Sequence, residues 1–264
     1  MTPAIIRPLP GERRVSYSAA WLVPVDAVTG SAPGLPLQVL LDIQEGQGWL
    51  PTGIAPIITL SGAVGYPDLG RRADAATAAP TRYRARFESE VYLALSRAYR
   101  DGEEFLAYPF DDTVPPAAAA SRVMVSLVPA AGYPFPGDLP VLYGQVSTAA
   151  GEPVPDVLLG VAMGPPALRT PQTVQALTGP GGTFALPLRW APAGQAITVT
   201  ATDYRHTPTR TGQLSVRLPD ALGHNQKIVI GLRQGASKWP STSAPACPTK
   251  RRKRISAPST RRPT

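Results

Sequence analysis

The stretch Arg82-Tyr83-Arg84-Ala85-Arg86-Phe87-Glu88 alternates charged and apolar side chains without interruption. Successive side chains of a β-strand point to opposite faces, so this pattern predicts an antiparallel strand with one buried and one solvated face. The charged series continues to Glu90, and we expect an exposed face of mixed charge; contact of the arginines with an acidic partner is the alternative. The apolar series continues to Leu95, but residues 88–100 also fit a helix, and the sequence leaves both interpretations open.

The same two-residue period recurs along most of the chain. In residues 15–25 the odd-numbered side chains, which include Trp21 and Val23, form the apolar series and the expected buried face. Turn sequences rich in Pro and Gly separate the later segments. Further strands are expected at 122–128, 142–147, 157–163, 183–190, 197–202, 213–218 and 228–232. Short strands spaced in this way are typical of β-sandwiches and barrels.

The composition agrees with this interpretation. Hydrophobic residues make up 43% of the 264 residues, enough to bury a core. The chain holds 32 prolines, which disfavour an all-helical protein because each proline inside a helix costs about 3 kcal/mol. A single cysteine excludes an intrachain disulfide framework and any all-cysteine metal site.

A weak internal repeat divides the chain. Residues 25–41 and 146–159 both read as a strand, a turn containing glycine, a proline-rich link and an apolar strand. Two tandem sandwiches follow from this repeat. The expected divisions are an N-terminal extension at 1–11, a first sandwich at 12–130, a Pro/Gly linker at 131–137, a second sandwich at 138–234 and a basic tail at 235–264.

The second expected sandwich carries the motifs Gly151-Glu152-Pro153-Val154-Pro155-Asp156-Val157 and Thr178-Gly179-Pro180-Gly181-Gly182-Thr183-Phe184-Ala185-Leu186. In these turns it resembles the carboxypeptidase regulatory-like domain, a transthyretin-like seven-strand sandwich. Gly179 stands where the family pattern has Asp, so one side-chain cap of the turn is missing. The first sandwich resembles the same class only loosely, through residues 26–30. Turn chemistry of this kind indicates a fold and not an activity.

The resemblance completes the predicted fold class: all-β, with two tandem Ig-like or transthyretin-like antiparallel β-sandwiches and a disordered basic C-terminal tail. It also implies a context, because such domains in bacteria serve as accessory, surface-display or assembly modules. Paired units of this kind resemble components of phage-tail-like and contractile injection clusters.

The formal net charge of +8 is concentrated at one end of the chain. Residues 238–264 hold eight basic residues and no acidic one. Such a run cannot bury itself and is expected to be disordered. It predicts weak contact with nucleic acid or another anionic surface, with a merely solubilising tail as the alternative. The candidate contact residues are Lys250, Arg251, Arg252, Lys253 and Arg254.

No catalytic, cofactor-binding or metal-binding residue is predicted, and no cofactor. The two histidines, His206 and His224, lack partners at metal-ligand or catalytic spacing. We interpret residues 203–206 as a polar turn. The loop at 61–79 is long enough to bind a ligand, and its candidate residues are Tyr66, Arg71 and Arg72.

We therefore expect a non-enzymatic structural or adaptor protein that joins components of a larger bacterial or phage-tail-like assembly. Its expected partners are proteins, including further copies of itself. Two alternatives stay open: a carbohydrate or cell-surface binding module that uses the 61–79 loop, and polyanion contact through the tail. No secretory signal and no apolar run of the roughly 20 residues that span a bilayer is present. Synthesis in the cytoplasm is expected, followed by incorporation into an assembled or released particle.

Overall fold

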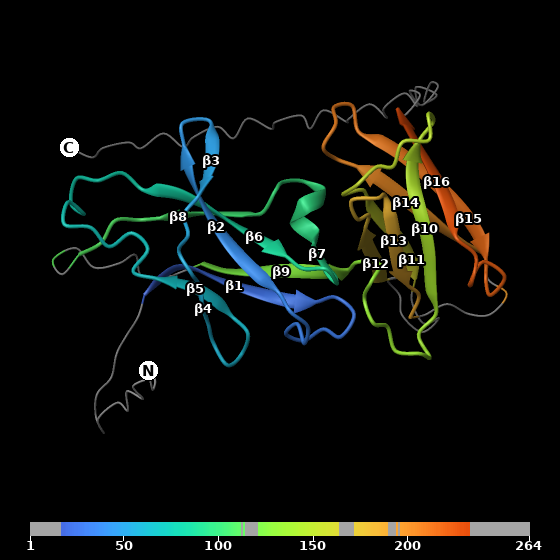
Figure 1. Cartoon of the computed structure of the whole chain (residues 1–264), viewed down its shortest axis with the longest axis horizontal. Helices are drawn as coiled ribbons and strands as arrows, with labels where there is room; N and C mark the ends of the chain where they lie inside the picture. The colour runs from blue at the N-terminus through green and yellow to red at the C-terminus, as the bar shows by residue number, and fades with distance from the viewer. Residues whose placement is uncertain are drawn as a thin grey trace, which may run out of the picture. The chain divides into compact units, whose positions relative to one another are not determined.

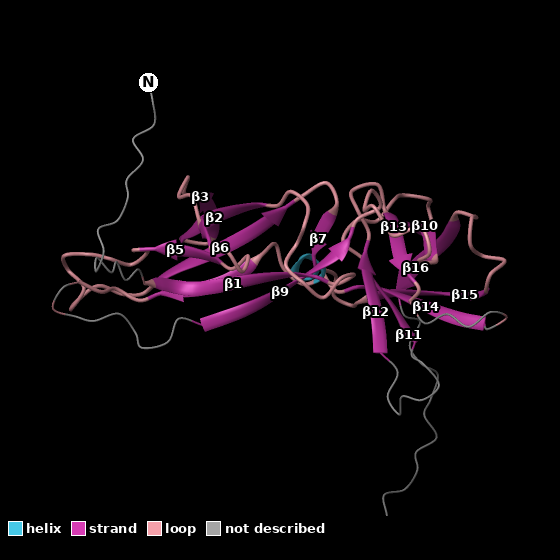
Figure 2. Ribbon diagram, turned by 90° about the horizontal axis from the view of Figure 1, so that it is seen from below, coloured by secondary structure: helices cyan, strands magenta, loops and turns pink. Residues whose placement is uncertain are grey.

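The computed structural model describes residues 17–111, 113, 121–163, 172–189, 194 and 196–232. Within these residues the regular secondary structure consists of strands, and the only helix is the single 3-10 turn η1, Leu95–Ala98 (Figure 1, Figure 2). The all-β fold class is confirmed. The expected N-terminal extension and the basic tail, with its five candidate contact residues, lie outside the described residues.

Two sheets are formed by the first half of the chain. The five-stranded sheet has the order β4 (Ile57–Ile58), β5 (Val64–Pro67), β1 (Ser18–Asp26), β9 (Ser121–Pro129) and β7 (Tyr92–Ala94). The four-stranded sheet has the order β3 (Gly48–Pro51), β2 (Gln38–Glu45), β6 (Thr81–Glu88) and β8 (Glu103–Ala107). Side chains from both sheets share one apolar core, which includes Leu22, Leu41, Phe87 and Leu127. The alternation in residues 82–88 is confirmed, because Tyr83, Ala85 and Phe87 are buried.

The second half of the chain forms one seven-stranded sheet. Its order is β12 (Gln172–Leu177), β11 (Leu158–Met163), β14 (Ala196–Asp203), β15 (Arg210–Arg217), β16 (Gln226–Leu232), β10 (Val141–Thr148) and β13 (Thr183–Pro187). β15 and β16 pair only through Arg210 with Leu232 and Thr211 with Gly231. Side chains from both sides of this junction, such as Val199 and Phe184, enter one core. The sheet therefore folds over to enclose its own core, as in a sandwich.

Two strand pairs are parallel, whereas the sequence predicts antiparallel sandwiches. β1 runs parallel to β9, and β10 runs parallel to β16. All the other pairs of named strands are antiparallel. Alternation reveals which face of a strand is buried but not which strand lies beside it or in which direction, so the sequence gives no signal of these two pairs.

The expected buried face of β1 is wrong. Ala20 and Leu22, at even positions, are fully buried, whereas Trp21 and Val23 are only partly buried. Gly65 of the neighbouring strand β5 leaves room for the Trp21 indole, since a Cβ added at Gly65 would lie 2.7 Å from that ring. The large ring lies across Gly65 on the outer face, and the smaller even-numbered side chains fill the core.

Residues 88–100 form neither of the two predicted structures. β6 ends at Glu88, and the chain then crosses to the other sheet, where β7 pairs with β9. η1 follows directly and is one turn long. The apolar residues after Glu88 therefore belong to a different layer from Tyr83 and Phe87.

The described residues belong to one compact unit. The two cores are joined by a third apolar cluster, to which β7 and β9 contribute Leu93 and Val128, and β11 and β12 contribute Leu158 and Leu177. The division into domains at the linker 131–137 stays a prediction.

Candidate functional site

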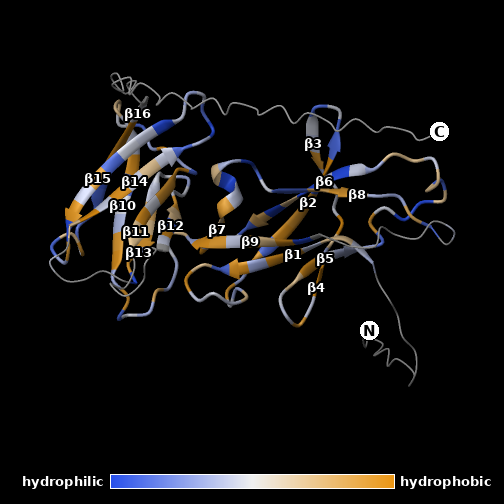
Figure 3. Ribbon diagram, turned by 180° about the vertical axis from the view of Figure 1, so that it is seen from behind, coloured by the Kyte–Doolittle hydropathy of each residue, from blue (hydrophilic) through white to orange (hydrophobic). Residues whose placement is uncertain are grey.

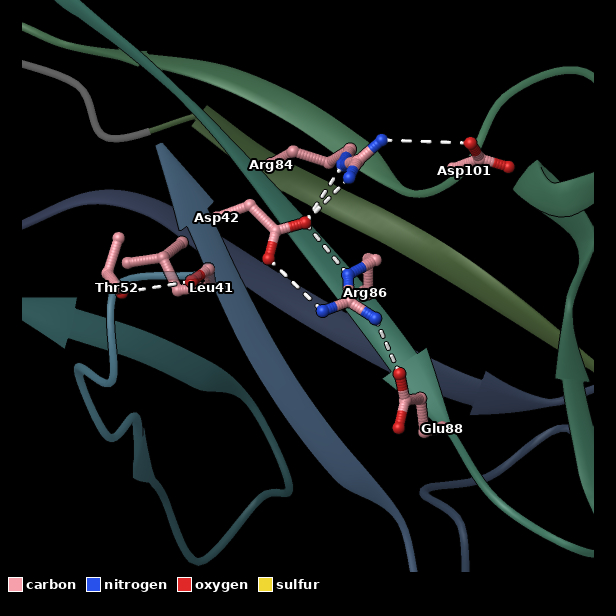
Figure 4. A network of polar contacts seen from close by, with 7 residues as sticks. All are labelled: Leu41, Asp42, Thr52, Arg84, Arg86, Glu88 and Asp101. Atoms are coloured by element: carbon pink, nitrogen blue, oxygen red, sulfur yellow. Dashed lines mark hydrogen bonds and ion pairs between the residues drawn. The ribbon is translucent and has the colours of Figure 1, made fainter. Parts of the chain in front are cut away.

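The most connected polar site in the described residues lies on the outer face of the four-stranded sheet. Val39 and Leu41 of β2 point into the core, so the strand period turns Asp42 to the opposite face. Asp42 lies directly across from Arg84 of β6, and Arg86 is its diagonal neighbour on the same face. Local strand geometry and register alone bring one carboxylate between two guanidinium groups (Figure 4).

The carboxylate of Asp42 accepts four hydrogen bonds. Arg84 donates to Oδ2 from Nε and Nη2 at 3.1 and 2.7 Å, and Arg86 donates from Nε to Oδ2 at 2.8 Å and from Nη2 to Oδ1 at 3.2 Å. Glu88 accepts a hydrogen bond from Arg86 Nη1 at 2.6 Å. The Asp42 side chain is only 2% exposed, so these bonds replace most of its hydration.

Burial and ion pairing act in opposite directions on Asp42. Burial by itself raises its pKa, but the hydrogen bonds and positive charges of Arg86 and Arg84 outweigh burial and hold the pKa below its ordinary value of 3.8. Asp42 is therefore a fixed anion at neutral pH. A carboxylate held in this way is poorly suited to accept a proton during catalysis.

The expected exposed face of mixed charge is wrong for Arg84 and Arg86. Arg82 fits the prediction, since it is exposed and lies 3.5 Å from Glu104. Arg84, however, is covered by its neighbours: its guanidinium lies 4.7 Å from the centroid of the Trp49 ring. A Cβ added at Gly102 would lie 3.0 Å from the Arg84 side chain, which shows how closely that turn approaches.

This network forms one wall of a pocket of about 450 Å³. Trp49 and Pro51 of β3 also line the pocket, as do Arg97 of η1 and Asp101 of the following turn. The pocket therefore presents fixed guanidinium donors beside the Trp49 ring.

A second polar cluster connects the two halves of the chain. Asp156 has a positive φ of 55°, a backbone conformation that Asp tolerates better than most residues. Its carboxylate lies 3.1 Å from Arg97 Nε and 3.1 Å from Arg205 Nη1. Tyr99 and Tyr204 lie beside these pairs, with ring centroids 4.8 Å apart. The polar turn at 203–206 thus takes part in this junction through Arg205, which also contacts the buried Asp203 at 3.2 Å.

Replacing Asp156 by asparagine is expected to lower the free energy of unfolding by about 1 kcal/mol, because both arginine partners are partly exposed. Asparagine tolerates the same positive φ, so the loss of stability measures the removed negative charge and not a strained backbone. Urea unfolding measures the effect, with Asp220→Asn at an exposed position as the matched control. Equal stability of the two variants would contradict the role of Asp156.

The candidate binding loop is placed differently from the prediction. Tyr66 is fully buried in β5, so the prediction that it contacts a ligand is wrong. Its pKa is raised to about 12 by burial and by the charge of Asp42. Arg71 forms an isolated bridge with Phe110, and Arg72 is paired with Asp74 at 2.9 Å. A ligand role for Arg71 and Arg72 stays a prediction.

An exposed apolar edge is the third candidate site, and sequence reasoning missed it. β4 is the edge strand of the five-stranded sheet, and Ile57 and Ile58 are both exposed, the latter at 64%. Ile54 before the strand and Leu60 after it are also exposed. Figure 3 draws β4 in the colour of hydrophobic residues. The run Ile54–Leu60 reads as a buried strand, and only its place at the sheet edge reveals that it is uncovered.

Some kinds of site are not found in the residues that the structure describes. No group of three or more His, Cys, Asp or Glu side chains is placed to hold a metal ion there. Over the same residues, no helix has both the length and the apolar character needed to cross a membrane.

The sequence matches no protein-family model and no curated protein. Among solved structures, the Bacillus anthracis TIE protein aligns at 8% identity and a TM-score of 0.27, covering 81% of this chain and 33% of that one. The shaft pilin spaA from Lactobacillus rhamnosus GG aligns at 9% identity and a TM-score of 0.25. The alignment covers 80% of this chain and 96% of the pilin. A streptococcal ancillary pilin aligns at 10% identity and a TM-score of 0.22. The alignment covers 81% of this chain and 62% of that pilin. The chain thus spans a third of the length of the first of these proteins, and similarity at such TM-scores carries no argument about function.

Proposed function

We propose that this protein is a non-enzymatic structural or adaptor protein that joins protein components of a larger bacterial assembly. The observation that carries the proposal is the exposed aliphatic edge at Ile54, Ile57, Ile58 and Leu60. Sheet edges offer unpaired backbone groups to other chains, and natural proteins usually protect them with charges, bulges or very short edge strands. β4 is short, but no charged side chain stands among its residues Ile57–Ile58. Contiguous exposed apolar groups are typical of interaction surfaces.

The rest of the described surface supports a binding role over a catalytic one. The most polar site holds its carboxylate and its two principal arginines in mutual ion pairs. The resemblance to carboxypeptidase regulatory-like domains adds the expectation of a module within a bacterial, phage-tail-like assembly. Identifying the products of the neighbouring genes would test that context directly.

The double variant Ile58→Lys/Leu60→Lys tests the apolar edge. We expect it to lose self-association and co-purification with neighbouring gene products by at least about tenfold, because two buried aliphatic contacts contribute about 1.5–3 kcal/mol each. Size-exclusion chromatography with light scattering and pull-down assays measure the loss. The thermal midpoint should change little, since exposed substitutions usually alter stability by less than about 0.5 kcal/mol.

The matched control is Val229→Lys, an exposed aliphatic position in β16 of the other sheet. It should assemble like the wild type. If the wild-type protein is monomeric and captures no partner, the proposed function is wrong. If the double variant assembles normally, the function stands but the surface is elsewhere.

A further inference from the structure

The pocket over the Asp42 network has no part in the proposed assembly contact. Its volume of about 450 Å³ lies within the range of about 300–1,000 Å³ that small-molecule sites usually have. Elements distant in sequence close it, since β2, β3, β6 and η1 all contribute side chains. A hollow of this size, lined by polar groups and partly open to solvent, is able to hold one small ligand.

The charges that line the pocket are balanced. Three arginines, Arg84, Arg86 and Arg97, face three carboxylates, Asp42, Glu88 and Asp101. Arg97 is also neutralised by Asp156 from the other half of the chain. An anionic ligand would have to compete with these carboxylates for every guanidinium, and a cation would have to compete with the arginines. Because the positive and negative charges of the lining are equal in number, the pocket favours a neutral ligand over an ion.

The guanidinium donors of Arg84 and Arg86 are held in fixed positions. Asp42 fixes both Arg84 and Arg86, so neither guanidinium has to be ordered when a ligand binds. The carboxylates at the rim, Glu88 and Asp101, are 49% and 85% exposed and keep lone pairs available to hydroxyl donors. Neighbouring hydroxyl oxygens on a ligand can accept from a guanidinium and donate to these carboxylates.

The same pocket also has an apolar side. Trp49 and Pro51 of β3 contribute apolar groups to its lining. The Arg84 guanidinium covers one face of the Trp49 ring, 4.7 Å from its centroid, so a ligand would pack against the other face. A pyranose sugar has the matching character, with C–H groups on its faces that pack against an aromatic ring and hydroxyl groups around its edge.

We propose that this pocket binds a neutral pyranose sugar, with the sugar face against Trp49 and its hydroxyl groups bonded to Arg86, Glu88 and Asp101. The proposal does not depend on the proposed assembly function. It places carbohydrate binding at β2, β3 and β6, away from the 61–79 loop.

NMR titration of the full chain tests the proposal. The probes are glucose, galactose and N-acetylglucosamine, each added separately, with inorganic phosphate as the anionic comparison. The indole N–H resonance of Trp49 is assigned by its disappearance in Trp49→Phe. We expect at least one sugar to shift this resonance saturably, and phosphate to leave it unchanged. A shift by phosphate alone, or no saturable shift by any of the three sugars, would overturn the proposal.

Two variants and one control complete the test. Trp49→Ala should weaken sugar binding by about tenfold, as expected for loss of an aromatic contact. Glu88→Gln, at a half-exposed position, should weaken sugar binding severalfold without disturbing the fold. This variant replaces Trp49→Ala in the test if Trp49→Ala is unstable. Tyr143→Ala, at an exposed aromatic of β10, should bind like the wild type. Wild-type affinity in Glu88→Gln would also overturn the proposed contacts.

Discussion

Replacing Asp42 by alanine is expected to lower the free energy of unfolding by about 3 kcal/mol, the lower end of the range for breaking a buried ion pair. The variant leaves the guanidinium groups of Arg84 and Arg86, which are 14% and 29% exposed, without their shared acceptor. Because both arginines retain some contact with water, the loss should not reach the upper end of that range. Urea unfolding at neutral pH measures it.

Asp101→Ala is the matched control, because Asp101 belongs to the same network but is 85% exposed and lies 3.8 Å from Arg84. Its effect should be below about 0.5 kcal/mol. Equal losses in the two variants would show that the burial of Asp42 is not what gives the network its strength.

The Asp42 network also predicts a pH dependence with a definite sign. The pKa of Asp42 is lowered in the folded protein, so its contribution to stability is fully present above the ordinary value of 3.8 and is lost as the pH falls through the lower, folded value. The stability difference between the wild type and Asp42→Asn should therefore be constant above pH 5 and shrink below about pH 4. Thermal unfolding at pH 7 and pH 3 measures this change. A difference that is the same at both values would contradict the assignment.

The strand faces could be predicted from the sequence wherever one face is apolar and the other charged. Residues 82–88 are of this kind, and residues 197–201 alternate apolar side chains with threonine; in both segments the apolar side chains are buried. The prediction failed for β1, where both faces carry apolar side chains and the space above Gly65 decides which face is the core. A period of two carries no information about such neighbours.

The sites depend on contacts between segments far apart in sequence. Asp42 is flanked by the apolar residues Leu41 and Ile43, which is a signal of a buried partner, but only the pairing of β2 with β6 identifies Arg84 and Arg86. Asp156 stands in the proline-rich turn of the recognised motif, yet its partner Arg97 comes from a helical turn that the sequence does not define. The exposure of Ile58 follows from the position of β4 in the sheet, which requires the full strand order.

A second large effect is expected at Asp26, a carboxylate buried at the end of β1. It accepts hydrogen bonds from the backbone N–H groups of Val28 at 2.7 Å and Thr29 at 3.3 Å, which shape the following turn. It also accepts from the hydroxyl groups of Tyr92 at 3.3 Å and Tyr133 at 2.8 Å. Burial and the hydrogen bond to Asp26 raise the pKa of Tyr133, so its hydroxyl remains a donor at neutral pH.

Asp26→Ala should therefore lower the free energy of unfolding by about 3 kcal/mol, because several buried donors lose their acceptor together. Tyr133→Phe removes one donor and keeps the ring, and should cost only about 1 kcal/mol. Chemical denaturation of both variants and of the double variant gives the coupling between them. Tyr143→Phe, at an exposed tyrosine, is the control and should have no measurable effect.

The coupling between Asp26 and Tyr133 decides how the 131–137 segment behaves. Tyr133 packs edge-on against Tyr92, with ring centroids 5.6 Å apart, and Phe135 packs against the same core. If these contacts anchor the segment, the double variant should lose less than the sum of the single losses, and proteolysis between residues 131 and 137 should be faster in Asp26→Ala than in the wild type. Additive losses and an unchanged cleavage rate would mean that the segment is a free tether. An anchored segment would connect the first core directly to the strand β10 that follows it.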